Sequence, residues 1–168
     1  MNREKGPDLQ YFEDVTVGEV RQFGSHTLTR EETTDFAAKY DPQDFHLSDE
    51  AAANSFFGRV SASGWNTAAV LMKLYVTQPG GDPEAGVGGI GADKLRWLKP
   101  VYPGDTLSLR VENIAKRRSR SKPEQGTVWQ AMTVLNQNDD PVMSAILIGL
   151  VKVRDPAANP DDAGTPPA

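Results

Sequence analysis

The chain has 168 residues, a formal net charge of −5 and no cysteine. That length suits one domain with its own core, while the lack of cysteine excludes disulfides and thiolate metal sites and is compatible with a reducing cytoplasm. The negative charge disfavours broad nucleic-acid binding, and no segment approaches the run of about 18 apolar residues that a membrane-spanning helix needs.

The two ends of the chain are expected to be flexible. Residues 1–9 carry no apolar core. Residues 154–168 are rich in Pro, Asp and Ala, so they cannot bury enough surface to offset the entropy lost on ordering. We therefore expect a flexible N-terminus, one folded domain over residues 10–153, and a disordered tail.

The first half of this domain predicts one strand followed by helices. Residues 18–28 begin with strand-like residues and contain His26, which we interpret as structural. Thr29 followed by Glu32 forms a capping box for a helix that runs through about Tyr40.

A long apolar helix is predicted from Trp65 onward, after a turn and a short helix. Apolar side chains cover most of its circumference at helical spacing: Trp65, Ala68, Ala69, Val70, Leu71, Met72, Leu74 and Val76. Such a helix is buried. The glycine-rich residues 78–91 then predict a flexible loop. Residues 86–91 match the three-glycine dinucleotide pattern, but residues 93–98 alternate like a strand where that pattern needs a helix.

The second half predicts antiparallel strands. Residues 107–112 alternate between apolar and polar, residues 127–135 form another strand candidate, and residues 142–153 are almost continuously apolar. Residues 136–141 form a turn between the last two, which favours antiparallel pairing. The fold class is therefore α+β, with one long central helix wrapped by an antiparallel sheet.

Asp41 and His46 form a candidate acid/base pair. Five residues apart on a continuous helix they would point roughly 140° away from each other. Pro42 breaks the helix, so a turn can bring both side chains to one point, where a carboxylate beside an imidazole suits proton transfer. The alternative is that Asp41 caps a turn and His46 is a packed surface residue.

Two further groups of residues suggest anion binding. Ser63 and Gly64 precede the long helix, where unpaired N–H groups can stabilise an oxyanion, although an ordinary helix start would look the same. The basic residues within 116–122 fit a solvated hairpin or, together with Lys94 and Arg96, a contact with the phosphates of a nucleotide-bearing substrate.

Three segments together resemble the MaoC-like dehydratases, relatives of the (R)-specific enoyl-CoA hydratases. They are residues 40–47, 57–69 and 100–107, within a likeness that spans roughly residues 8–153. The resemblance implies a hot-dog fold and a homodimer, or higher homo-oligomer, whose sheets join. It also implies a cytoplasmic lyase of fatty acid metabolism that requires no metal or redox cofactor, because coenzyme A arrives as part of the substrate.

The catalytic residues that the resemblance implies are Asp41 and His46. They fall on the Asp and His of the family's Asp-x-Asn-Pro-x-His motif, which hold the catalytic water. Gln43 and Asp44 depart from that motif, and Asp44 adds a negative charge that could alter the pKa values of the pair. Gly64 matches the position whose N–H is expected to receive the thioester oxygen. The substrate-binding residues expected are Gln43, Ser63, Gly64, Trp65, Lys94 and Arg96.

The implied reaction is the reversible hydration of a trans-2-enoyl-CoA to an (R)-3-hydroxyacyl-CoA. An acyl-CoA thioesterase on the same fold would direct water at the carbonyl carbon instead. A non-catalytic acyl-CoA-binding protein is the other alternative, motivated by Asp44. Asn66 stands where the related branch often has His, which alters the pocket shape we expect.

Overall fold

The computed structural model describes residues 10–77, 82, 84–158 and 161–167. The prediction for residues 1–9 lies outside these ranges. The helices are η1 (Phe12–Asp14), α1 (Arg30–Tyr40), α2 (Asp44–Leu47), α3 (Asp49–Ala53), α4 (Gly64–Val76) and η2 (Pro156–Ala158). The strands are β1 (Val20–Thr27), β2 (Gly86–Trp97), β3 (Thr106–Arg118), β4 (Gln125–Leu135), β5 (Pro141–Lys152) and β6 (Ala163–Gly164).

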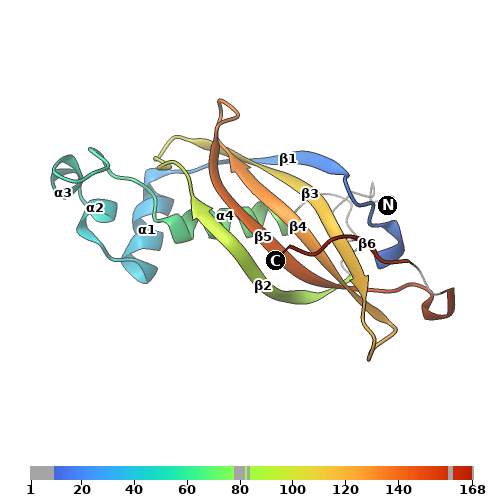
Figure 1. Cartoon of the computed structure of the whole chain (residues 1–168). Helices are drawn as coiled ribbons and strands as arrows, with labels where there is room; N and C mark the ends of the chain where they lie inside the picture. Colours follow the sequence, from blue (N-terminus) through green and yellow to red (C-terminus); the bar gives the residue numbers. More distant parts are fainter. Residues whose placement is uncertain (1–9, 78–81, 83, 159–160, 168) are drawn as a thin grey trace, which may run out of the picture.

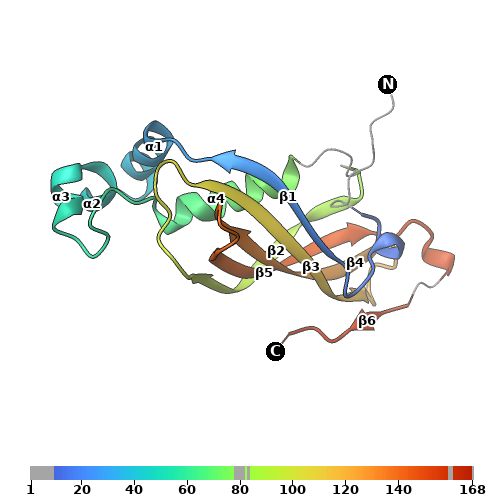
Figure 2. The same ribbon diagram turned by 90° about the horizontal axis from the view of Figure 1, so that it is seen from above.

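An antiparallel sheet with the strand order β1-β3-β4-β5-β2 packs against α4. The short β6 pairs with β3 beside this path. Figure 2 shows α4 along one face of the sheet, and Figure 1 shows α1, α2 and α3 gathered beyond one end of it. This confirms the predicted α+β architecture and the antiparallel pairing of the last two long strands.

The core lies between α4 and the inner face of the sheet. Leu107, Leu109 and Val111 of β3 are fully buried, in keeping with the predicted alternation. From α4, Val70 and Leu71 are buried against them. The prediction that the whole helix is buried was wrong for one side, which includes Trp65, Met72 and Val76 and is about half exposed. This side of the helix is more apolar than is usual for a surface in contact with solvent, which indicates that another surface covers it.

The start of α1 follows the predicted cap in part. Thr29 Oγ1 accepts a hydrogen bond from the backbone N–H of Glu32 at 3.1 Å. The carboxylate of Glu32 does not turn back onto the cap but bonds His26 Nε2 at 2.9 Å. His26 therefore links β1 to α1, the structural role that the sequence suggested.

The glycine-rich residues 86–91 form part of β2 and are not the predicted loop. They pair with β5, with register shifts at Gly86/Gly88 and Gly89/Gly91. Backbone pairing with a long neighbouring strand outweighs the poor intrinsic strand preference of glycine, and the glycines are taken up at irregularities of the ladder. The remaining residues of the predicted loop lie largely outside the described ranges.

The described part of the C-terminal tail also differs from the prediction. β6 pairs with β3 through Ala115 and Lys116, and the backbone N–H of Arg118 donates to Asp162 Oδ1 at 2.6 Å. Edge hydrogen bonds and a charged partner hold this segment, which has almost no apolar side chains to bury. Disorder predicted from hydrophobicity alone misses contacts of this kind.

We predict that Gly126→Ala destabilises the domain, because a β-carbon there would lie 2.2 Å from the ring of Phe12. Phe12 is fully buried, so overpacking should cost about 1–3 kcal/mol of unfolding free energy. The matched control is Gly149→Ala, where a β-carbon meets nothing within 4 Å. In urea unfolding, the midpoint concentration should be lower for Gly126→Ala than for the wild type and unchanged for Gly149→Ala. Equal midpoints for the two variants would show that Phe12 does not pack on Gly126.

Candidate active site

Asp41 and His46 meet at the end of α1. Asp41 is the C-cap of α1, with φ −151° and ψ 66°, and His46 lies on the short α2 that follows Pro42. Asp41 Oδ2 lies 3.5 Å from His46 Nε2. The broken helix therefore brings together two side chains that a continuous helix would hold apart.

The imidazole of His46 has a fixed orientation. His46 is buried, and its Nδ1 lies 2.7 Å from the carbonyl oxygen of Ser61. A carbonyl oxygen only accepts hydrogen bonds, so Nδ1 carries the proton. In the neutral ring, Nε2 then presents a lone pair on the side of Asp41.

The carboxylate of Asp41 is held by two donors. Ser63 Oγ donates to Oδ2 at 2.6 Å, and Gln43 Nε2 donates to Oδ1 at 2.8 Å. The hydrogen bond from Ser63 is the largest influence on the pKa of Asp41; with Gln43 and His46 it outweighs partial burial and lowers that pKa below its ordinary value. Asp41 is therefore an anion at neutral pH, and it accepts hydrogen bonds with both oxygens.

Asp44 does not disturb this pair. It is exposed at the first turn of α2 and lies in a separate surface depression, next to Leu47 and Ser48. Asp44 is also not among the groups that shift the pKa of Asp41. The expected repulsion is absent because the helix start turns the side chain of Asp44 away from Asp41.

The first turn of α4 contributes one unpaired backbone donor. Ser63 is the N-cap, and its Oγ accepts from the N–H of Trp65 at 3.2 Å. The N–H groups of Asn66 and Thr67 donate to the carbonyl of Ser63. Within the described part of the chain, the N–H of Gly64 has no acceptor.

Gly64 is required by a neighbouring side chain. A β-carbon at this position would lie 2.4 Å from the indole of Trp97. The sequence suggested that glycine here admits the substrate to the backbone, but in this structure Trp97 takes the close approach. Trp97 in turn contacts Trp65 edge to face, with ring centroids 5.1 Å apart.

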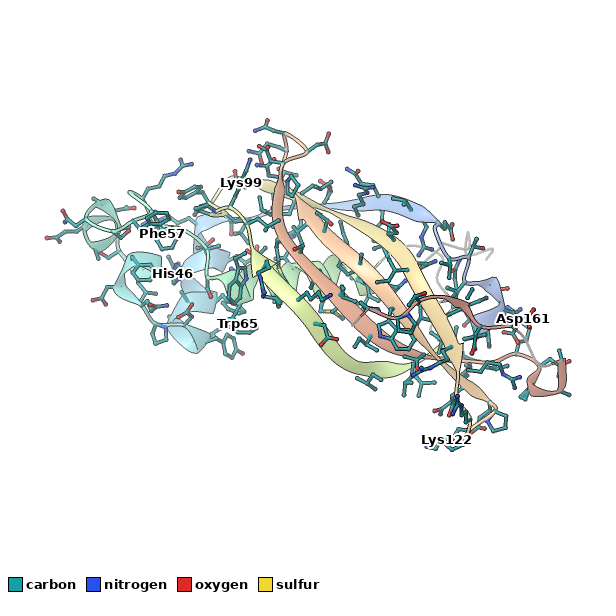
Figure 3. The ribbon with its side chains drawn as sticks, viewed as in Figure 1. His46, Phe57, Trp65, Lys99, Lys122 and Asp161 are labelled. Atoms are coloured by element: carbon teal, nitrogen blue, oxygen red, sulfur yellow. The ribbon has the colours of Figure 1, made fainter. Side chains whose placement is uncertain are left out.

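These groups open into one cavity of about 570 Å³. Its polar groups are those of Asp41, Gln43, His46, Gly64, Thr67 and Lys99, and its apolar lining is formed by Phe45, Phe56, Phe57, Ala62, Trp65, Trp97, Leu98, Pro100 and Val101. Figure 3 shows His46, Phe57 and Trp65 at the same end of the molecule. Few polar groups in a largely apolar cavity are typical of a small-molecule site.

Two predicted substrate-binding residues do not reach the cavity. Lys94 has a φ of 52° within a bulge of β2, and the alternation of side chains along the strand is broken there. Arg96 donates to the carbonyl oxygen of Leu95. The cation on the cavity lining is instead Lys99, which pairs with Asp140 at 2.8 Å. No periodic pattern in the sequence identifies Lys99 as a site residue.

The basic hairpin is remote from Asp41 and His46. Figure 3 shows Lys122 and Asp161 at the opposite end from His46. Arg117, Arg118 and Arg120 lie with Asp161 and Asp162 in a surface depression. Within one chain, the suggested joint role with Lys94 and Arg96 in phosphate binding therefore does not arise.

Sequence reasoning also missed Trp97, Phe45 and Phe57 as site residues. Phe45 packs edge-on to His46 at 4.5 Å and against Phe57 at 5.3 Å. The sequence does place several aromatic residues close to Asp41 and His46, and this clustering could have identified Phe45 and Phe57 as site residues. Across the described residues, no group of three or more His, Asp or Glu side chains could hold a metal ion. None of the helices described is long and apolar enough to cross a membrane.

The chain is similar to known proteins in sequence and in fold. The model of a family described as "MaoC like domain" matches residues 13–134. A crystal structure described as a MaoC-like dehydratase from Rhodospirillum rubrum is 34% identical, with a TM-score of 0.80 over 87% of this chain and 99% of that one. The mesaconyl-CoA hydratase of Cereibacter sphaeroides is 40% identical over 82 residues, which are 48% of this chain and 23% of that protein.

The fold is the predicted hot-dog fold. A Mycobacterium tuberculosis protein described as having a double hot-dog fold superimposes with a TM-score of 0.74, at 19% identity, over 94% of this chain and 48% of that one. At that identity, the likeness concerns the fold alone.

We predict that Ser63→Ala raises the pKa of Asp41 toward its ordinary value, because the strongest hydrogen bond to the carboxylate is lost. The lowered pKa of Asp41 contributes stability above its unfolded-state pKa, and this is lost as the pH falls through the folded-state pKa. Ser63→Ala should therefore lose this pH-dependent contribution of Asp41 to the stability of the fold.

The control is Ser48→Ala, which also removes a helix N-cap but has no contact with Asp41. A ¹³C NMR titration of the Asp41 carboxyl group should show the shift in the first variant only. The same pKa in both would contradict the assigned role of Ser63.

Proposed function

Because the chain belongs to the MaoC-like domain family, we propose that it hydrates trans-2-enoyl-CoA esters reversibly to (R)-3-hydroxyacyl-CoA esters. One observation carries the proposal: Asp41 Oδ2 and His46 Nε2 lie 3.5 Å apart on the lining of a cavity that Gly64 also lines. The similarity to a hydratase of a CoA ester supports the same reaction class.

The two acceptors suit one water molecule. Water has two O–H groups, so it can donate one to Asp41 and one to His46 and direct a lone pair at the β-carbon of the substrate. As the C–O bond forms, Asp41 accepts one proton from water. His46 orients that water and helps to deliver the proton held by Asp41 to the α-carbon. One H and the OH of the same water are then added, Asp41 returns to its ionised form, and no cofactor is consumed.

The N–H of Gly64 serves the other end of the conjugated system. Attack at the β-carbon moves the electrons of the double bond toward the thioester oxygen, which becomes an enolate oxygen. A fixed backbone donor at a helix start stabilises that charge without reorganisation. Ser63 sets the geometry because it both caps α4 and binds Asp41.

Two other functions remain to be distinguished by experiment. A thioesterase would direct the same water at the carbonyl carbon and release a free thiol. The case for a non-catalytic binding protein rested on Asp44, and that residue points away from the cavity. The hydratase reading is therefore the better supported of the three.

We also propose that two copies of the chain pair through β2. Within the described chain, β2 is bonded on one side only, to β5, and most of its residues are exposed. Its Val87 lines one apolar groove of about 470 Å³ together with Met72 and Val76 from the exposed side of α4, and its Ile90 is 60% exposed. An exposed edge strand with apolar neighbours is covered by a partner in most proteins.

The role of the Asp41 carboxylate can be tested by its effect on activity. Asp41→Asn should lower kcat for crotonyl-CoA hydration by at least about 10²-fold, as expected when a general base is lost. Asp44→Asn is the matched control, because it removes a nearby carboxylate that lies outside the cavity, and it should keep near wild-type rates. The loss of enoyl absorbance measures hydration.

An unchanged rate in Asp41→Asn would refute the assignment. Release of free thiol by the wild type, with the enoyl absorbance retained, would favour the thioesterase. Binding of CoA esters with no turnover of any of them would favour the non-catalytic alternative.

The second prediction concerns assembly. Ile90→Lys places a charge on the exposed part of β2 and should convert a dimer into a monomer in sedimentation velocity experiments. Val20→Lys is the control, because Val20 is an exposed apolar residue on the opposite edge strand, β1. A wild-type protein that sediments as a monomer, or two variants that behave alike, would rule out pairing through β2.

A further inference from the structure

The indole of Trp97 presents the face of its five-membered ring to Gly64. A β-carbon on Gly64 would lie 2.4 Å from both Nε1 and Cε2 of Trp97, and 2.8 Å from Cδ1. These atoms belong to the pyrrole ring of the indole, so the five-membered ring faces the first residue of α4. The fit leaves no room for any side chain at position 64.

This contact places two N–H donors close together. A β-carbon lies roughly 2.5 Å from the backbone nitrogen of its own residue, so Trp97 Nε1 is within about 5 Å of the nitrogen of Gly64. Donors at such a separation can both reach one oxygen at the usual distance of about 2.9 Å. Because the indole N–H points along the plane of the ring, an acceptor that both donors reach lies beside the ring, next to Nε1 and the first turn of α4.

Neither donor is used by the protein. Across the residues that the structure describes, the N–H of Gly64 has no acceptor and no hydrogen bond is made by the indole nitrogen of Trp97. Trp97 is 48% exposed, and both residues line the cavity that holds Asp41 and His46. An indole nitrogen can only donate, so the N–H of Trp97 is available to an acceptor atom of a ligand in this cavity.

The indole is also held in place before any ligand binds. Trp65 contacts it edge to face at an interplanar angle of 81°. The backbone of Trp97 pairs with Met143, which is buried in the core. A donor that is already fixed stabilises the developing negative charge without any rearrangement during the reaction.

We propose that Trp97 is a catalytic residue whose indole N–H is the second donor to the thioester oxygen, opposite the N–H of Gly64. This rests on the proposed hydratase function. When the water oxygen bonds to the β-carbon, the displaced electron pair moves toward this oxygen and forms an enolate. It returns to the α-carbon when that carbon takes up a proton. The two donors stabilise the charge between these steps.

The kinetic test compares two tryptophans of the same cavity. Trp97→Phe keeps an aromatic ring against Gly64 but removes the N–H, and it should lower kcat for crotonyl-CoA hydration by about 10²-fold, with a smaller change in KM. Trp65→Phe is the matched control, because it alters the other half of the same ring pair, and it should lose far less. Equal losses in kcat would overturn the proposal and indicate a packing role.

A second measurement uses the wild-type protein and two CoA ligands that it cannot hydrate. Butyryl-CoA carries the thioester oxygen but has no double bond to hydrate, and S-butyl-CoA lacks the oxygen altogether. The ¹H–¹⁵N resonance of the Trp97 indole in the wild-type protein should move downfield with butyryl-CoA and stay near its unbound position with S-butyl-CoA. The Trp129 indole lies outside the cavity and should respond to neither.

The outcomes separate the two proposals. A downfield shift specific to butyryl-CoA, in a protein that does not hydrate crotonyl-CoA, would keep the Trp97 donor and reject the hydratase. Hydration without that shift would keep the hydratase and reject the Trp97 donor. Identical indole shifts with both ligands would also reject it, because the oxygen would then make no contact.

Discussion

The hydrogen bond from Ser63 to Asp41 joins the two halves of the site. Asp41 ends α1, and Ser63 caps α4, so one 2.6 Å contact fixes the carboxylate relative to the helix start that presents the N–H of Gly64. The same contact is the largest cause of the lowered pKa of this carboxylate. It therefore sets the distance between an acceptor for water and a donor for an oxyanion, which lie on two different elements.

The sheet supplies the rest of the geometry. The buried side of α4 packs on the inner face of the strands, which sets the position and the direction of the helix start. β2 then ends at Trp97, directly against Gly64. The exposed side of α4 and the open edge of β2 belong to one apolar surface, so the elements that build the site also build the surface proposed for pairing. The proposed assembly and the proposed catalysis therefore depend on the same two elements.

Much of this could be predicted from the sequence, for physical reasons. Periods of 3.6 and 2 identify α4 and β3, and the proline after Asp41 predicts that the helix breaks where the acid/base pair needs it to break. Local composition failed where long-range pairing decides the structure. The glycines of β2 and the tail near Asp162 take their conformation from neighbouring strands. Trp97 was missed because its contact with Gly64 joins positions far apart in the chain, which periodicity does not detect.

The central claim is that Asp41 and His46 act on one water molecule. A double-mutant cycle in crotonyl-CoA hydration tests it most directly, with Asp41→Asn, His46→Gln and the combined variant. If both groups hold the same water, removing the second after the first should cost little more, so the combined variant should be about as slow as the slower single one. Losses that multiply in the combined variant would show that the two side chains act independently and would contradict this account.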